Sequence, residues 1–261
     1  MSDEAFLLRV ILSFLVGGIY IAVMARMSEK FGSKLGGLLI ALPGATLVGL
    51  GFIAWIQGPA ALTEATEMMP ATLAVSTIFL VIFSLLYRFG LLAAYFGAMF
   101  VWFTLSSAIV TLDFENMAVA FLIAAVLFTT SISFFHHEPH RTLPAVKGGP
   151  WTLLIRALFA GSFVALAVIC SRWLGPVWGG LFASFPAAFS AVILIFGRAH
   201  GREFTASTSR TMVNGVLANV VFVTGIHFMA LSFGSAVSIV LAYLICLVFA
   251  VFSYRYIIPR I

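Results

Sequence analysis

The sequence predicts an all-α protein: a polytopic transmembrane helix bundle of about nine spans, built as two inverted four-helix repeats joined by a linker helix. Three observations predict this fold. The 261 residues are 62% hydrophobic and only 9% charged, with a mean hydropathy of +1.15, whereas soluble domains carry about 25% charged residues. Apolar stretches of about 20 residues, each long enough to cross a ~30 Å hydrocarbon core, follow one another along the chain. One string with a glycine pair and a proline occurs twice.

The predicted spans follow in chain order and are separated by short polar segments. The tight breaks YRFG at 87–90 and SFGS at 232–235 each separate two neighbouring spans. We expect a first repeat in residues 1–112, a linker helix and loop in 113–150, and a second repeat in 151–261. The nine spans cover residues 6–25, 35–57, 69–87, 90–112, 116–135, 151–171, 175–197, 210–231 and 234–254.

The basic residues predict the orientation of the chain. With nine spans, twelve of the fourteen Lys and Arg residues fall on one face, and only Arg9 and Arg172 fall on the other. Cytoplasmic loops carry an excess of Lys and Arg. We therefore expect a multi-pass protein of the cytoplasmic (inner) membrane, with the N-terminus outside and the C-terminus in the cytoplasm.

Other features limit the classes of function. The start MSDEAFLLR has an acidic front and no basic region, so we expect no cleavable signal peptide. Cys170 and Cys246 lie in apolar runs and indicate neither a disulfide nor redox chemistry. The net charge of +5 sits in loops and does not indicate nucleic-acid binding. We expect the lipid bilayer and a small-molecule substrate as partners, no cofactor, and a monomer or a homo-oligomer.

The repeat is carried by GGLLIALPGA at 36–45 and GGLFASFPAA at 179–188, which lie 143 residues apart. The same offset relates Met69 to Met212 and Phe79 to Phe222, and a slip of one residue pairs the two FG dipeptides at 89–90 and 233–234. Because a single fifth span separates the copies, the second copy enters the membrane from the opposite face. Inverted repeats of this kind are typical of secondary transporters, whose substrate sites lie near the midplane.

Pro43 and Pro186 are expected to break their helices about 10–16 Å deep in the membrane. The carbonyls freed near Leu39 and Ala183 must then face other helices or a cavity, because lipid offers no donor. Inversion would bring the two breaks together as a central site. The predicted substrate-binding residues are Gly36, Gly37, Pro43, Thr46, Ser76, Gly179, Gly180, Ser184, Pro186, Asn214 and Asn219.

A simpler interpretation stands beside this one for several of these residues. Prolines are tolerated in membrane helices, and glycine pairs often only let two helices pack closely. Asn219 and its counterpart Ser76 fit interhelical hydrogen bonding as well as substrate contact. Arg9 and Arg156 hold equivalent positions near the starts of spans one and six. They either extend to lipid headgroups or form matched charges for an anionic substrate.

Ionisable groups give two further indications. The predicted spans contain no Asp or Glu, which counts against proton or sodium coupling through a membrane carboxylate. The cluster HHEPH at 136–140, with His200 and Glu203 in another loop, offers donors for zinc or nickel. Its spacing matches no established ligand pattern, so a solvated loop is the favoured interpretation and no metal site is predicted.

The repeated unit, a four-span module whose second helix opens with GGL-x4-P, resembles the small bacterial membrane proteins of the GlpM type, grouped with the family DUF3147. The residues that carry the resemblance are Gly36, Gly37 and Pro43, with Gly179, Gly180 and Pro186 in the second copy. It implies a membrane location and a topology rather than an activity. The four-plus-four inverted layout is also similar to the drug/metabolite transporter superfamily. This chain lacks the acidic first-span residue of its small multidrug exporters, so proton-coupled drug export is not expected.

Together these features favour a secondary transporter, permease or flippase for a small neutral or anionic substrate, free or lipid-linked. Its central site would lie at the paired proline-broken helices. Two alternatives stay open at this point: a membrane-embedded metal-dependent enzyme using the HHEPH loop, and a non-catalytic membrane accessory subunit.

Overall fold

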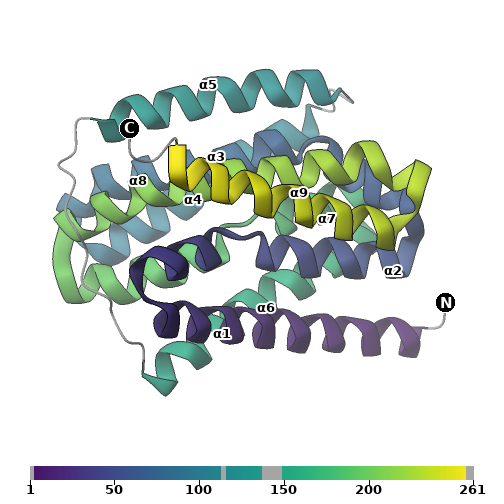
Figure 1. Ribbon diagram of the computed structural model, residues 1–261, viewed down its shortest axis with the longest axis horizontal. Coiled ribbons are helices and arrows are strands. Elements are labelled where there is room, and N and C mark those ends of the chain that lie inside the picture. Colours follow the sequence, from purple (N-terminus) through teal and green to yellow (C-terminus); the bar gives the residue numbers. More distant parts are fainter. Residues whose placement is uncertain (1–2, 113–115, 137–148, 257–261) are drawn as a thin grey trace.

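The computed structural model describes residues 3–112, 116–136 and 149–256, without the side chains of residues 28–41, 188–189, 191–192, 195–196, 198–211, 214 and 254–256. Within these ranges the chain forms a bundle of nine α-helices and one 3-10 helix, with no β-strand (Figure 1). The predicted helical bundle is confirmed. The helices are α1 (Asp3–Ala41), α2 (Gly44–Glu67), α3 (Met69–Leu86), η1 (Tyr87–Phe89), α4 (Leu91–Thr111), α5 (Met117–His136), α6 (Pro150–Trp173), α7 (Pro176–Ala183), α8 (Ala187–Phe233) and α9 (Ser235–Tyr256).

Eight helical segments in the described ranges are long and apolar enough to cross a membrane, and the chain is an integral multi-pass membrane protein. The expected span 175–197 is not among them, because the chain divides it between the short helix α7 and the start of α8. The expected span 35–57 is divided in the same way between α1 and α2. Both divisions fall at the prolines, so the predicted breaks at Pro43 and Pro186 are confirmed.

Two of the polar segments between expected spans do not end a helix. Residues 26–34 and 198–209 do not separate helices; the backbone stays helical through both segments, inside α1 and inside α8. Neither segment contains a proline, so no missing amide forces the helix to end there. Polar composition alone marks where a chain leaves the membrane, and a helix can continue past that point.

The two proline breaks have the same backbone geometry. Pro43 has φ −74° and ψ 60°, and Pro186 has φ −77° and ψ 54°, which is the inverse γ-turn conformation. Accordingly, the Gly44 amide donates to the Leu42 carbonyl at 2.8 Å, and the Ala187 amide donates to the Phe185 carbonyl at 2.8 Å. Each proline then precedes the first residue of a new helix.

Two further features are shared by the expected repeats. Gly90 (φ 104°) and Gly234 (φ 76°) make the left-handed turns between α3 and α4 and between α8 and α9. Both conformations favour glycine, because a Cβ would clash with the backbone. These positions are the glycines of the paired FG dipeptides. The shared geometry supports the duplication, which itself stays a prediction.

Helices α1 and α6, the first helices of the two expected repeats, pack in opposite directions. Arg172 at the end of α6 donates to the Asp3 carboxylate at the start of α1, at 3.0 Å. Further along, a Cβ on Gly18 of α1 would lie 2.8 Å from the Ala157 carbonyl oxygen near the start of α6. Small residues thus bring the two backbones together, as in many membrane helix pairs. Antiparallel packing is what an inverted repeat requires.

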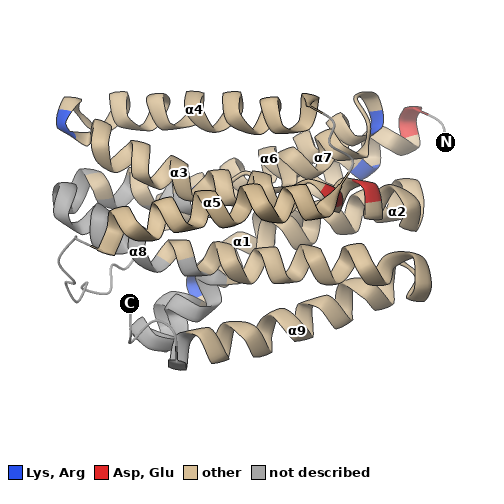
Figure 2. Ribbon diagram, turned by 90° about the horizontal axis from the view of Figure 1, so that it is seen from above, with Lys and Arg blue, Asp and Glu red and all other residues tan. Residues whose placement is uncertain are grey.

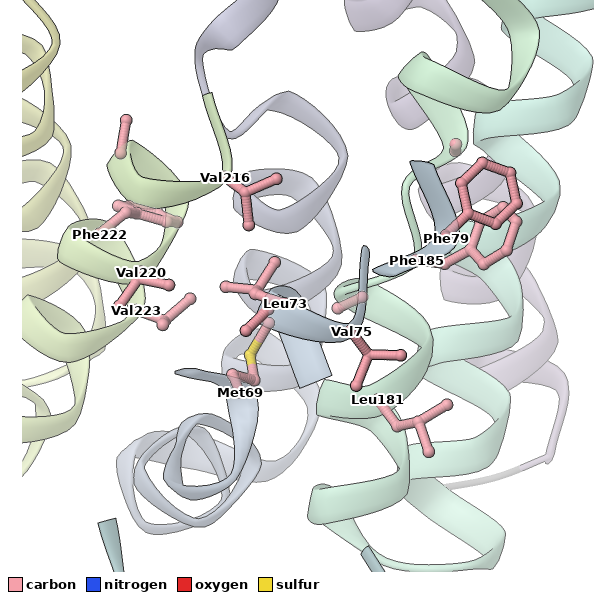
Figure 3. Packing of buried hydrophobic residues seen from close by; sticks show 14 of the residues in the cluster. Met69, Leu73, Val75, Phe79, Leu181, Phe185, Val216, Val220, Phe222 and Val223 are labelled. Atoms are coloured by element: carbon pink, nitrogen blue, oxygen red, sulfur yellow. The ribbon is translucent and has the colours of Figure 1, made fainter. Parts of the chain in front are cut away.

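Helix α3 lies at the centre of the bundle. In its most apolar stretch 78% of the residues are buried, against 22–50% in the corresponding stretches of the other seven membrane segments. Figure 3 shows Met69 and Leu73 of α3 lying between Val216 and Val220 of α8 on one side and Leu181 of α7 on the other. In Figure 1, α5 covers one edge of the bundle, while α1 and α6 form the opposite edge. The second break, between α7 and α8, is therefore packed against the central helix.

The acidic residues whose side chains are described gather at one end of the bundle, where the N-terminus lies (Figure 2). They belong to the start of α1 and the last turns of α2. The sequence assigns all of them to one face, in agreement with this grouping. That this end faces the outside of the cell stays a prediction.

We expect Gly180→Ala to lower the free energy of unfolding by about 1–3 kcal/mol, the usual cost of overpacking. The added Cβ would collide with the backbone carbonyl of Ala65 in α2 and push α7 away. The measurement is the midpoint of thermal unfolding in detergent. Gly51→Ala in α2 is the control, because its Cβ would meet no other heavy atom within 4 Å. Equal loss of stability in both variants would show that this close approach is not required.

Candidate functional site

A pocket lies where the two helix breaks meet. Its wall includes Pro43 and Gly44 from the first break and Ser184 and Pro186 from the second. Further wall residues come from α1, α3, α6 and α8, namely Tyr20, Met24, Leu73, Ser76, Arg156, Val216 and Asn219. Its volume is about 80 Å³. At about 10–15 Å³ per water molecule, it has room for about five to eight water molecules or one small solute.

The breaks are joined by a direct hydrogen bond. In a continuous helix the Ala183 carbonyl would accept from the amide of Ala187, but that amide bonds to Phe185 in the γ-turn. The freed Ala183 carbonyl instead accepts from the hydroxyl of Thr46, in the first turn of α2, at 3.0 Å. Thr46 is only 5% exposed. A side chain of the first break thus satisfies a backbone group that the second break releases.

Ser76 of α3 binds the next freed carbonyl. Its hydroxyl donates to the Ser184 carbonyl at 3.4 Å and accepts from the Trp102 indole N–H at 3.1 Å. The neighbouring Thr77 accepts from Ser131 of α5 at 2.8 Å. Trp102 is fully buried, so this network fixes Ser76 beside the break through α4 and α5. The polarity at this depth of α3 serves interhelical bonding, with Ser76 also lining the pocket.

Arg156 is the charged residue of the described pocket wall. It lies six residues after the start of α6, about 9 Å along the helix axis, and is only 6% exposed. The guanidinium stays charged at any physiological pH. Its expected counterpart Arg9 lies elsewhere: it donates to the Trp55 carbonyl at 3.4 Å and stacks on the Trp55 ring at 4.7 Å. The two arginines are therefore not a matched pair in this structure.

The predicted site residues fall into three groups. Six line the pocket together: Pro43, Thr46, Ser76, Ser184, Pro186 and Asn219. Two lie outside it, because Gly179 contacts Ser171 and Ala167 of α6 while Gly180 contacts Ala65 of α2. Their role in the structure is close helix packing, the simpler of the two interpretations that the sequence offered. Gly36 and Gly37 lie in α1 and Asn214 in α8, and their surroundings are outside the described part of the chain.

The sequence did not predict Tyr20 and Met24 of α1 as pocket residues. The Tyr20 hydroxyl lies 3.1 Å from that of Tyr243 in α9, and the Tyr20 ring packs where a Cβ of Gly44 would be. The glycine after Pro43 was the available signal, since it leaves room for an aromatic ring at the break. Arg156 was noted in the sequence, either as a side chain that extends to lipid headgroups or as a charge matched with Arg9.

The metal hypothesis falls mostly outside the described residues. Residues 137–140 of the HHEPH loop, and the side chains of His200 and Glu203, are not described. In the ranges that are described, no three His, Cys, Asp or Glu side chains come together as metal ligands would.

Residues 153–258 match the family described as "Protein of unknown function (DUF3147)". The match runs from the first turns of α6 past the end of α9, and it supports the resemblance drawn from the GGL-x4-P string. It covers the second of the two expected repeats and assigns no activity. No curated protein and no solved structure is similar enough to this chain to count as a match.

We expect Thr46→Val to destabilise the protein by about 1 kcal/mol, because it leaves the Ala183 carbonyl without its donor inside the membrane. Thr129→Val in α5 is the matched control. Its exposed hydroxyl bonds only to the Ala125 carbonyl of its own helix, so its loss should cost close to nothing. The check is thermal unfolding in detergent. Equal effects of the two substitutions would contradict a bond between the breaks.

Proposed function

We propose that the protein is a secondary transporter or permease for a small neutral or anionic solute, free or lipid-linked. The substrate site is the pocket between the helix breaks, and it opens alternately to the two sides of the membrane. One observation carries the proposal: a single pocket is lined by both prolines of the repeated string.

Discontinuous helices near the midplane are the usual means by which transporters build substrate sites. Non-helical backbone at this depth is tolerated only where it is buried in protein or lines a cavity. Here both conditions hold. The carbonyls at Ala183 and Ser184 are bonded by hydroxyls, and the breaks themselves form the wall of the pocket. Such an arrangement is costly to build, which favours a functional role over accidental kinks.

Alternating access also needs contacts that open and close. Between the pocket and the N-terminal end of the bundle, Gln57 of α2 donates to the hydroxyl of Ser171 in α6 at 2.6 Å. Nearby, His227 Nδ1 of α8 lies 3.1 Å from the Thr63 carbonyl of α2. These contacts join α2 to both α6 and α8 at that end. In the proposed cycle they break when the pocket opens toward the N-terminal end.

The proposal is tested by cysteine labelling, which needs no known substrate. In a background lacking Cys170 and Cys246, Val216→Cys in the pocket wall should react with a membrane-impermeant thiol reagent applied from either face of sealed vesicles. Each face reaches the pocket in one of the two states. Val223→Cys is the matched control, because it lies two turns further along α8, is fully buried and does not line the pocket. It should stay unreacted.

Reaction of Val216→Cys from one face only would contradict alternating access. That result would favour a non-catalytic accessory subunit with a static pocket. Reaction from both faces together with ion leakage through the vesicle membrane would instead indicate a continuous pore and would also overturn the proposal.

A further inference from the structure

We infer that the pocket binds a small oxyanion, a carboxylate or a phosphate, through Arg156 and the amino ends of α2 and α8. The inference rests on the proposed function in one respect, since it takes the pocket to be the substrate site. It goes further by naming the chemical class of the ligand.

Arg156 brings a buried positive charge to the pocket. A buried charge inside a membrane protein is costly, and such residues usually face a functional cavity. Arg156 is 6% exposed and lines the pocket. Its planar, permanently charged guanidinium matches the two oxygens of a carboxylate or phosphate. An arginine that only extended to headgroups would leave its guanidinium exposed at the membrane surface, as the half-buried Arg9 comes closer to doing.

The broken helices point their amino ends toward the pocket. Helices α2 and α8 both begin at the pocket, and Gly44, Ala45 and Thr46 of α2 and Ala187 of α8 form part of its wall. The amino end of a helix carries a partial positive charge, which favours anions. The amides of Gly44 and Ala187 are bonded in the γ-turns, so the amides of the residues that follow them are the donors at these ends. Two such ends meet here beside one arginine, and all three contributions have the same sign.

Two carbonyls at the second break are already bonded to hydroxyl groups. The carboxyl end of α7 also lies at the break, and its free carbonyls would repel an anion. The Ala183 carbonyl accepts from Thr46 at 3.0 Å, and the Ser184 carbonyl accepts from Ser76 at 3.4 Å. These bonds give two carbonyls of the second break a donor, which weakens their repulsion of an anion. No Asp or Glu is found among the described residues of its wall.

Three hydroxyl groups of the wall are not donors to a ligand, so a bound oxyanion depends on Arg156 and the helix amides. The protons of Thr46 and Ser76 go to the two carbonyls of the break, and Ser184 donates to the Leu181 carbonyl at 2.7 Å. Three hydroxyls therefore have no proton left for a bound solute. The volume of about 80 Å³ suits an anion of about the size of acetate, lactate or phosphate, or one lipid phosphate group.

The test uses calorimetry to measure the binding of small solutes to the purified full-length protein in detergent. The probes are acetate, lactate and inorganic phosphate, with uncharged acetamide and lactamide as controls. We expect at least one of the anions to bind and its uncharged analogue not to bind. Arg156→Gln should weaken that binding by at least about tenfold, the usual effect of losing a charge-assisted hydrogen bond, and Arg156→Lys should weaken it less. Arg9→Gln, the matched control outside the pocket, should bind as the wild type does.

A second variant and a comparison of two lipids complete the test. Asn219→Asp changes the pocket wall by one charge at almost constant shape and should abolish anion binding even if Arg156→Gln fails to fold. Vesicles of phosphatidylglycerol and of phosphatidylcholine separate the possible sources. If the free anions do not bind but phosphatidylglycerol raises the unfolding temperature of the wild type and not of Arg156→Gln, the oxyanion is a lipid phosphate.

Several results would overturn the inference: no response to any free anion or to phosphatidylglycerol, equal binding of acetamide and acetate, or unchanged anion binding by folded Arg156→Gln. The proposed function fails separately. Anion binding with labelling of Val216→Cys from one face only would leave the ligand class intact and remove the transporter. Labelling from both faces together with binding of uncharged solutes only would leave the transporter proposal intact and remove the oxyanion as the ligand.

Discussion

A proline inside a membrane helix frees backbone carbonyl groups for which lipid offers no donor, and this constraint determines how the centre of the molecule is built. A carbonyl left without its donor inside the bundle costs about 1 kcal/mol or more. At the second break the γ-turn uses the Ala187 amide, so the Ala183 carbonyl depends on Thr46 from the first break. The second break is therefore more stable in the presence of the first. The chain places them together, and the pocket is the space that their turns leave.

Close helix packing makes that arrangement possible. Helix α7 has only eight residues, too few to be stable alone. Gly179 and Gly180 let it approach α6 and α2 at backbone distance, and Leu181 packs on the core around α3 (Figure 3). The short helix is thus held by its neighbours. In its second copy the repeated string has two tasks: its glycines position the short helix α7, and its proline ends that helix at the pocket.

The sequence was sufficient for the parts of this structure that depend on local chemistry. Apolar length predicted the membrane helices, proline chemistry predicted both breaks, and the repeat predicted that the breaks lie close together. Position along a helix does not reveal which neighbour a side chain meets, so Gly179 and Gly180 were expected at the pocket and lie in helix contacts instead. For the same reason Tyr20 was missed and Arg156 was paired with Arg9. Those assignments depend on tertiary packing, which the spacing of residues along a helix does not determine.

The central claim is that the two helix breaks meet, and a disulfide between them tests it most directly. A Cβ on Gly49 of α2 would lie 3.2 Å from the Ala183 Cβ at the end of α7, close to the separation of about 3.5–4.5 Å in a disulfide. With Cys170 and Cys246 replaced, the pair Gly49→Cys and Ala183→Cys should oxidise to one intramolecular bond, detected by mass spectrometry as a cross-linked peptide. Gly51→Cys with Ala183→Cys should not cross-link. Two free thiols in the first pair, or equal cross-linking of both pairs, would contradict the claim.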